Sequence, residues 1–486
     1  MGPTRLLALA GLLVLAGVAL ARNVPKLAPG MYDWAEPGNV AAALVEGRGF
    51  SDPFSGGTGA TAWVSPLPVW VEAGVFAVCG VKTAAAAGTL LVLSVLGLAG
   101  ALALLLSALA PYGAALRTTA AASFLLYAAL LPGSPLQVLS EAWLDLLLSA
   151  ALLWSALAVR RTAGPRGGAA LVAVAFLAPL ENAGLAAAVG LVVLLLAWQR
   201  RRQPRGLVLP LVAAAASALA VAGWAVRNAE ALGRFIPLKS NGWFELHLAN
   251  VDSADGLPRM ETVLRRLPFF DVREFQRYSE LGEVAYVDSF RAPARAALRA
   301  DPAHFAGNLL RRIYVAAVFC RREGGGEATR YPFRQDDAVR LVAAGELIPF
   351  GGKAGALWTR IDAAPAAEQE RFRRLGLAEA PAIFADWAAR RAAFDAEFRG
   401  PWPIAVGFLS AGVPVAALLG AALLGRGKMG PPADWALVIG CAMLLPYVLV
   451  NNNDRHQLPL FAMQAVALGA FAQAVANRRA AGRAAA

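Results

Sequence analysis

The chain has 486 residues, of which 58% are hydrophobic and only 16% are charged, so it is far too apolar for a soluble protein of this length. The formal net charge of +12 does not indicate nucleic acid, because the basic residues form short clusters between apolar runs. The three cysteines, Cys79, Cys320 and Cys441, have spacings that suit neither a metal site nor a disulfide scaffold. We therefore expect an all-α polytopic membrane protein, since helices satisfy their own backbone polar groups in lipid.

Apolar runs long enough to cross a bilayer recur along most of the chain. Ten spans are predicted, over residues 6–22, 84–108, 118–132, 137–158, 168–182, 184–199, 206–224, 402–425, 433–450 and 457–476. Basic clusters with almost no acid follow alternate spans, which by the positive-inside rule places both termini in the cytoplasm. The first run also has the form of a secretory signal ending at Ala19-Leu20-Ala21, and either alternative sends the next segment to the outer face.

The spans divide the chain into three parts. Residues 1–224 form an N-terminal transmembrane module with a first outer loop at 23–83, residues 225–401 form a mainly helical extracytoplasmic domain, and residues 402–486 form the C-terminal helices and a cytoplasmic tail. Within the middle part, helical spacing is present at 283–299 and 302–320, with Asp301 as an N-cap. Residues 366–398 are predicted to form one or two charged amphipathic helices. Residues 63–80 are apolar but contain Pro66, Pro68 and Glu72, and are predicted as an interfacial helix.

Three outer segments carry the polar residues of interest. The first outer loop contains Met31-Tyr32-Asp33-Trp34-Ala35-Glu36-Pro37-Gly38-Asn39, then Phe50 after a glycine pair, then Thr61-Ala62-Trp63. The second contains Arg227-Asn228, a stretch from Gly233 to Asn250 and, further on, Gly282-Glu283. The third is the turn Asn451-Asn452-Asn453-Asp454-Arg455-His456, with Pro459 behind it.

In order and spacing these segments resemble bacterial GT-C glycosyltransferases, a superfamily that includes protein mannosyltransferases and lipid A aminoarabinose transferases. The resemblance covers residues 1–320 and 400–476. It implies a GT-C-type bundle of about ten transmembrane helices and an inverting transferase. Such an enzyme moves a sugar from a polyprenyl-phosphate-linked donor to an extracytoplasmic lipid, glycan or protein acceptor.

Sugar transfer to a hydroxyl or amine needs a carboxylate that accepts a proton while the phosphate leaves. Glu36 is the first candidate for this base and Asp33 the second, because three residues of separation put both acids on one face of a helix. The alternative is that both are solvated loop acids. Relatives often carry an Asp-Glu pair here, and Ala35 occupies the position of the aspartate.

A leaving phosphate also needs fixed cations. The candidates are Lys239, Arg455, His456 and Arg227, although Arg227 lies at a span end and an arginine there commonly reaches lipid headgroups instead. Glu141, Asp145 and Glu181 lie near outer span ends and, with Glu245, are candidates for lining the donor cavity; the alternative for the first three is an interface position in contact with water. His247 and His304 lack partners at metal-ligand spacing, so no metal site is predicted, and relatives differ in their dependence on divalent cations.

Two other functions compete with the transferase. A catalytically silent protein that binds lipid-linked glycans or scaffolds an envelope complex agrees with Ala35, and a transporter of lipid-linked sugars would need more charge within the spans than the sequence has. The alanine- and arginine-rich composition is typical of a GC-rich bacterium. The expected location is therefore the bacterial plasma membrane, with the site facing the exterior and with membrane lipids and a lipid-linked sugar as partners.

Overall fold

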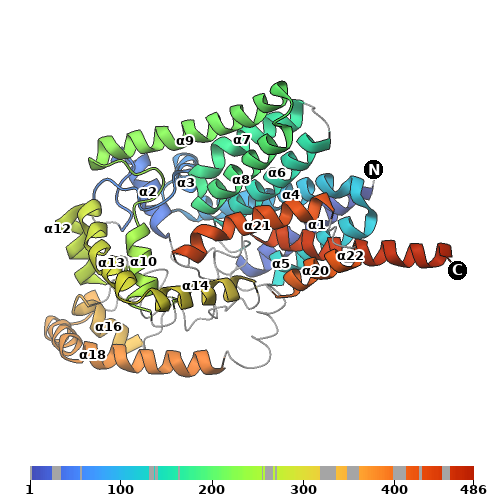
Figure 1. Ribbon diagram of the computed structural model, residues 1–486. Coiled ribbons are helices and arrows are strands. Elements are labelled where there is room, and N and C mark those ends of the chain that lie inside the picture. Colours follow the sequence, from blue (N-terminus) through green and yellow to red (C-terminus); the bar gives the residue numbers. More distant parts are fainter. Residues whose placement is uncertain are drawn as a thin grey trace.

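The computed structural model describes residues 3–23, 34–54, 57–130, 136, 141–161, 165–253, 256–257, 266–268, 271–317, 335–346, 361–397, 412–425, 430–450 and 460–485. These residues form helices and connecting segments, and their extended pairing is limited to one antiparallel bridge between Ser51 and Ala60. The predicted all-α class is thus confirmed for the described chain (Figure 1).

Each predicted span overlaps a helix. These helices are α1 (Pro3–Asn23), α4 (Ala84–Leu109), α5 (Ala114–Leu130), α6 (Ala142–Arg161), α7 (Pro165–Glu181), α8 (Ala183–Arg200), α9 (Val208–Leu232), α20 (Gly412–Leu424), α21 (Pro431–Leu449) and α22 (Phe461–Ala485). Within the described parts of the chain, five regions are long and apolar enough to cross a bilayer, those of α4, α6, α8, α9 and α21. The chain is a helical membrane protein, and membrane crossing by the other five helices stays a prediction.

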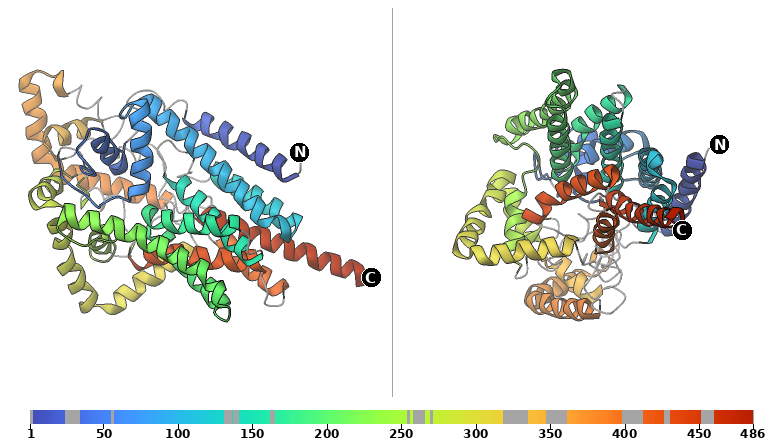
Figure 2. Two further views of the ribbon diagram at one scale, coloured as in Figure 1. Left: turned by 90° about the horizontal axis from the view of Figure 1, so that it is seen from above. Right: turned by 45° about the vertical axis from the view of Figure 1, so that its right-hand side comes forward.

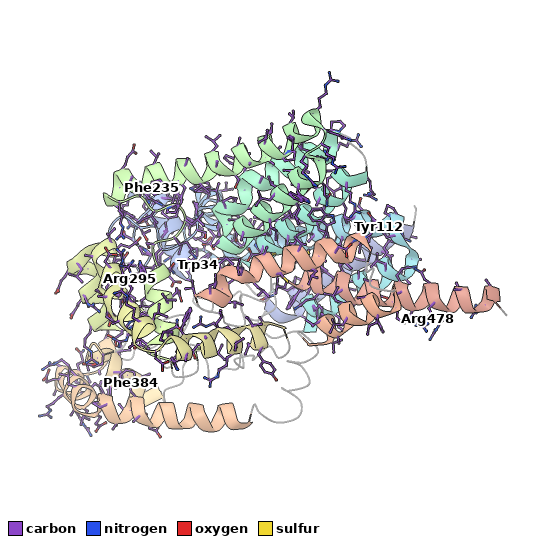
Figure 3. The ribbon with its side chains drawn as sticks, in the orientation of Figure 1. Trp34, Tyr112, Phe235, Arg295, Phe384 and Arg478 are labelled. Atoms are coloured by element: carbon purple, nitrogen blue, oxygen red, sulfur yellow. The ribbon has the colours of Figure 1, made fainter. Side chains whose placement is uncertain are left out.

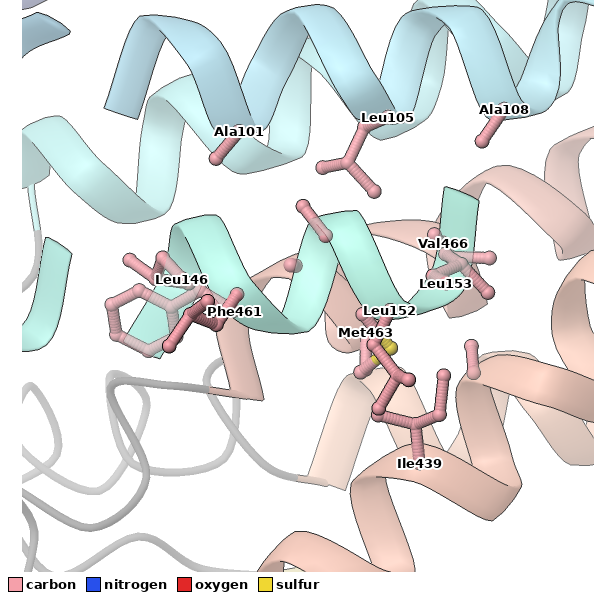
Figure 4. Close-up of a cluster of buried hydrophobic side chains, with 14 of the residues drawn as sticks. Ala101, Leu105, Ala108, Leu146, Leu152, Leu153, Ile439, Phe461, Met463 and Val466 are labelled. Carbon is pink, nitrogen blue, oxygen red and sulfur yellow. The ribbon is translucent and has the colours of Figure 1, made fainter. Parts of the chain in front are cut away.

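The main hydrophobic core lies between these helices. Helix α4 packs on α6, α5 on α22, α7 on α9 and α8 on α21. Figure 4 shows part of this core, where Leu105 of α4, Leu153 of α6 and Met463 of α22 are buried together with Ile439 of α21. Lipid tails are as apolar as leucine, so packing of this kind, and not the exclusion of water, holds such helices together.

A second group of helices gathers at one end of the bundle. It contains α2 (Glu36–Val45), α3 (Pro66–Cys79), α10 (Gly242–Asn250), α12 (Val272–Ser289), α13 (Arg291–Ala300) and α14 (Pro302–Ala317). Both chain termini lie at the opposite end in every view (Figures 1 and 2), and Figure 3 likewise places Trp34 and Arg295 far from Tyr112 and Arg478. Termini at one end agree with the predicted topology, and their cytoplasmic side stays a prediction.

Buried aromatic rings fill the core of this second group. Trp63 lies with its ring centroid 5.1 Å from those of Phe54 and Phe244, and Phe244 lies 5.2 Å from Phe290. Tyr278 completes the set, 4.9 Å from Phe54. Because these rings come from the first outer loop, α10, α12 and the residue after α12, they join the two outer polar segments into one structure.

The helices of the middle part differ in detail from their predicted ranges. The predicted helix 283–299 is divided at Phe290 into α12 and α13, because Pro293 has no N–H to donate to the carbonyl of Ser289 in a continuous helix. Gly282 bends α12 with a φ of 73°. Asp301 caps α14 as predicted, and its Oδ1 accepts a 2.8 Å bond from the His304 amide.

Helices α16 (Gln335–Ala343) and α18 (Ala366–Glu397) form a small separate unit of the middle part. Their apolar sides share a core that includes Val339, Val342, Ile383 and Phe384. An ion pair of 2.6 Å between Arg340 and Glu379 also joins the two helices. Of the one or two charged helices predicted at 366–398, the structure has one continuous element, with Pro381 inside it.

Candidate functional site

Glu36 begins α2, directly before Pro37, and is half-buried. Proline suits the first turn of a helix because an N–H there has no intrahelical partner. The indole of Trp34 packs edge-on against Phe76 of α3, with centroids 4.8 Å apart, and so attaches the start of α2 to α3. Asp33 lies outside the described residues. The role of either acid as a base stays a prediction.

Polar bonds hold the connection between α2 and α3. The Asn39 side chain donates to the Pro53 carbonyl over 2.9 Å and accepts a 2.5 Å bond from Lys82 Nζ. Asp52 has a φ of 61°, which is uncommon for a residue with a side chain, and its carboxylate accepts a 2.9 Å bond from the Gly59 amide. The described part of the first outer loop is therefore folded against the helices.

Glu283 is the buried centre of the contact between the two outer segments. Its Oε1 accepts a 2.7 Å bond from the Ala62 amide, and its Oε2 accepts bonds from the Thr61 hydroxyl and, over 2.7 Å, from the Tyr278 hydroxyl. Burial raises the pKa of Glu283, and these donors partly oppose that rise. We call Glu283, Thr61, Ala62 and Tyr278 the Glu283 network.

Arg227 holds the same loop from α9. Its Nη1 donates to the Thr61 carbonyl over 2.5 Å, and its Nη2 donates to the Phe50 carbonyl over 2.6 Å. The guanidinium also lies 5.1 Å from the ring centroid of Trp224 on the same helix. These bonds give Arg227 a structural function that neither sequence alternative included. Phosphate binding by this residue stays a prediction.

Acidic side chains gather beside the loop, at the start of α6 and the end of α7. Asp145 and Glu181 interact electrostatically with each other and with Glu141, and the field of the exposed Lys239 acts on both of them. The amide of Asn182 donates to Asp145. The structure thus brings together four residues singled out from the sequence. Glu181 is 4% exposed, and its Oε2 has no hydrogen-bond partner among the described residues.

Glu72 of α3 is a further member of this region to which sequence reasoning assigned no role. The only sequence signal was an acid inside the apolar run 63–80. The side chain is 7% exposed and interacts electrostatically with Glu141 and, with opposite sign, with Lys82. Helix α3 has 14 residues, too few to cross a bilayer. Burial, followed by the charge of Glu141, raises the pKa of Glu72 to about 8.

The remaining predicted site residues are distributed over other places. Glu245 accepts a 3.3 Å bond from Asn241 within its own segment. His247 Nε2 lies 3.5 Å from Asp252, whose carboxylate is held 3.1 Å from Arg266, so the pKa of Asp252 is low despite its burial. Among the described residues no group of three His, Cys, Asp or Glu side chains has an arrangement that could hold a metal ion.

Arg455 and His456 lie outside the described residues, but the helix end before them is held by Arg312 of α14. This arginine is fully buried. Its Nε donates to Gly256, its Nη1 to the carbonyls of Val448 and Leu449, and its Nη2 to Ala249 and the Asn250 side chain, at 2.6 to 3.5 Å. The cation thereby stabilises the C-terminal carbonyls of α21 and α10.

The end of the bundle away from the termini therefore combines the bonded, described part of the first loop, a group of carboxyl side chains and an exposed lysine. Such a site can exchange protons and bind anions at the membrane surface. Comparisons with known proteins contribute nothing further, because no protein-family model, no curated protein and no solved structure matches the chain.

Proposed function

We propose that this chain is a membrane glycosyltransferase of the GT-C type, which transfers a sugar from a polyprenyl-phosphate donor to an extracytoplasmic acceptor. The observation that supports the proposal is the union of the first outer loop with the second outer segment through the Glu283 network and Arg227. This union gathers carboxyl groups and Lys239 at one end of a membrane bundle. Those are the groups that such a transfer requires.

In the proposed step, the acceptor oxygen or nitrogen attacks the anomeric carbon of the sugar. Its proton moves to the carboxylate of Glu36, or of Asp33, as the new bond forms. The bond from the anomeric carbon to the phosphate oxygen breaks, and the lipid phosphate leaves with the electron pair. Lys239, Arg455 and His456 balance the charge that grows on that phosphate.

The test is turnover of a panel of polyprenyl-phosphate sugars by the purified chain in lipid, with acceptor or with water. Glu36→Gln and Asp33→Asn are compared with Glu46→Gln, an exposed acid directly after the other end of α2. We expect Glu36→Gln to lose at least a hundredfold in rate, in line with the usual contribution of a general base, roughly 10²–10⁴-fold. Full activity in both Glu36→Gln and Asp33→Asn contradicts the assignment of the base.

A second function is supported by Ala35, the residue at which this sequence departs from the Asp-Glu pair of the resembling family. It is a catalytically silent protein that binds lipid-linked glycans. Saturable binding of a donor lipid without turnover across the whole panel favours this alternative. Movement of a labelled lipid-linked sugar between leaflets favours a transporter instead.

A further inference from the structure

A small cavity lies between α3, α4 and the start of α6. Its volume is about 20 Å³, and its polar lining comes from Glu72, Ser94 and Glu141. Leu90 and Trp143 are among its apolar lining residues. A cavity of this size has room for one water molecule and none for a sugar. The three polar side chains provide the two to four hydrogen-bonding groups that a buried water needs.

Glu72 presents an oxygen that no group of the described residues satisfies. Its Oε2 is buried and has no hydrogen-bond partner among the described residues. The same atom lies against the first turn of α2, 3.2 Å from the position that a Cβ on Gly38 would take. A buried carboxylate oxygen without a donor strongly disfavours the ionised form of the side chain. The chemistry of this side chain therefore calls for a proton or a donor from a ligand.

The charges around Glu72 favour a proton. Glu141 faces it from the start of α6, with Asp145 behind on α6 and Glu181 on α7, and all three are acids. Helix α4 contributes the Ser94 hydroxyl, which donates to its own Leu90 carbonyl and has lone pairs free to accept.

Two further acids lie near α2. Glu36 is its first residue, and Glu46 directly follows its last residue. The cations nearby are Lys82, which is bonded to Asn39 and lies in the field of Arg48, and the exposed Lys239. The exposed Glu46 is paired with Arg48 and stands apart from the cavity. Among the described residues around the cavity, the four acids Glu72, Glu141, Asp145 and Glu181 are accompanied by only these two lysines, so they cannot all be ionised together.

We propose that Glu72 and Glu141 form a buried proton-binding site, in which the two carboxyl groups share one proton through a single water in the cavity. The ionised member of the pair accepts a hydrogen bond from that water, and the protonated member donates one. In this state neither carboxyl leaves a bare charge in the protein interior. The behaviour of the pair as one titrating unit is the property to be measured.

The catalytic consequence of this site rests on the proposed transferase function. A proton that leaves the acceptor passes to Glu36 at the start of α2, and from there to the ionised member of the pair beside Gly38. The pair then releases the proton to solvent, which restores the starting state. Glu72 is thus a positioning and proton-storing residue, and its loss changes the pH at which the transferase works more than its affinity for the donor.

Infrared difference spectroscopy of the purified chain in lipid tests the site without any need for activity. Burial also raises the pKa of Glu283, so the Glu72 contribution is isolated by subtraction of spectra. We expect the wild-type spectrum minus that of Glu72→Gln to contain a protonated-carboxyl band at neutral pH. The Glu141→Gln variant should retain a band that titrates at lower pH, because the neighbouring negative charge is gone. The control Glu46→Gln should leave the band unchanged, and Glu72→Asp, which keeps a carboxyl, should retain it if the glutamine variant does not fold.

Three results overturn the proton site. The first is an infrared band that Glu72→Gln does not alter. The second is a band that disappears on raising the pH with the midpoint of an ordinary exposed carboxyl. The third is a band that disappears at constant pH when potassium in the buffer is exchanged for sodium. The last result would assign the cavity to a small cation.

Transfer assays separate the two proposals. If the infrared band is present but no donor is turned over, the transferase is refuted and the proton site is retained. If Glu72→Gln turns over donor with the same pH profile as the wild type, the catalytic consequence is refuted.

Discussion

Removal of the Glu283 carboxylate is the most direct test of how the outer end is held together. In Glu283→Ala three donors lose their acceptor, namely the Ala62 amide and the hydroxyls of Thr61 and Tyr278. An unsatisfied buried donor costs about 1–3 kcal/mol, and the two hydroxyls can rotate towards other acceptors while the amide cannot. We therefore expect the attachment of the first outer loop to weaken by about 3–4 kcal/mol.

The isosteric variant separates hydrogen bonding from charge. In Glu283→Gln the amide oxygen still accepts from the Ala62 N–H, and the new NH₂ group donates to hydroxyls that reverse their direction. Because burial raises the pKa of Glu283, the site already tolerates a neutral group. We expect this variant to lose only about 1 kcal/mol. If the charge beside Arg227 were the main contribution, the glutamine variant would instead be nearly as damaged as the alanine variant.

Amide hydrogen exchange of the protein in lipid measures this attachment locally. A loss of about 3–4 kcal/mol corresponds to exchange at Ala62 and Ser240 that is faster by roughly a hundred- to a thousandfold, at about 1.4 kcal/mol for each factor of ten. Ser240 is included because its amide donates to the Ala62 carbonyl over 2.9 Å. The matched control is Glu280→Ala, an exposed acid on α12. Unchanged exchange in Glu283→Ala, or equal acceleration in both Glu283 variants, refutes the reasoning.

Three further expectations concern stability. Arg312→Met should lower the free energy of unfolding by about 3 kcal/mol and Arg312→Lys by about half of that, since lysine keeps the charge and three of the five donors. Equal thermal midpoints for the two variants would contradict this. Gly38→Ala should cost about 1–2 kcal/mol by overpacking, because its Cβ meets Trp34 at 3.1 Å, whereas Gly74→Ala on α3, with open space around it, should be neutral or stabilising in the same melting experiment. Glu72 has a folded-state pKa raised from 4.5 to about 8, so its contribution to stability is complete below pH 4.5 and is lost as pH rises through 8. The thermal midpoint of the wild type should therefore fall over this pH range, and that of Glu72→Gln should fall less. Parallel curves for the two proteins would refute this expectation.

The sequence by itself determined the membrane class, the helix positions and several local details. Hydrophobic runs of adequate length are a local property, so each predicted span overlaps a helix, although α9 and α22 continue eight and nine residues beyond the predicted ends. The cap at Asp301 was predictable for the same reason, because a capping side chain and its amide are three residues apart. Asp33, Arg455 and His456 lie outside the described residues, and their predicted functions remain untested.

Only the tertiary structure decided which polar side chains meet. Glu283 bonds to Thr61 across 222 positions, Arg227 bonds to Phe50 across 177, and Arg312 bonds to Val448 across 136. Such pairs depend on how helices pack, and the hydrophobic pattern of one segment contains no information on the polar group that its neighbour presents. Glu72 shows this most clearly. In the sequence it is an acid within an apolar run, and only folding places the cavity, Gly38 and the second carboxyl, Glu141, around it.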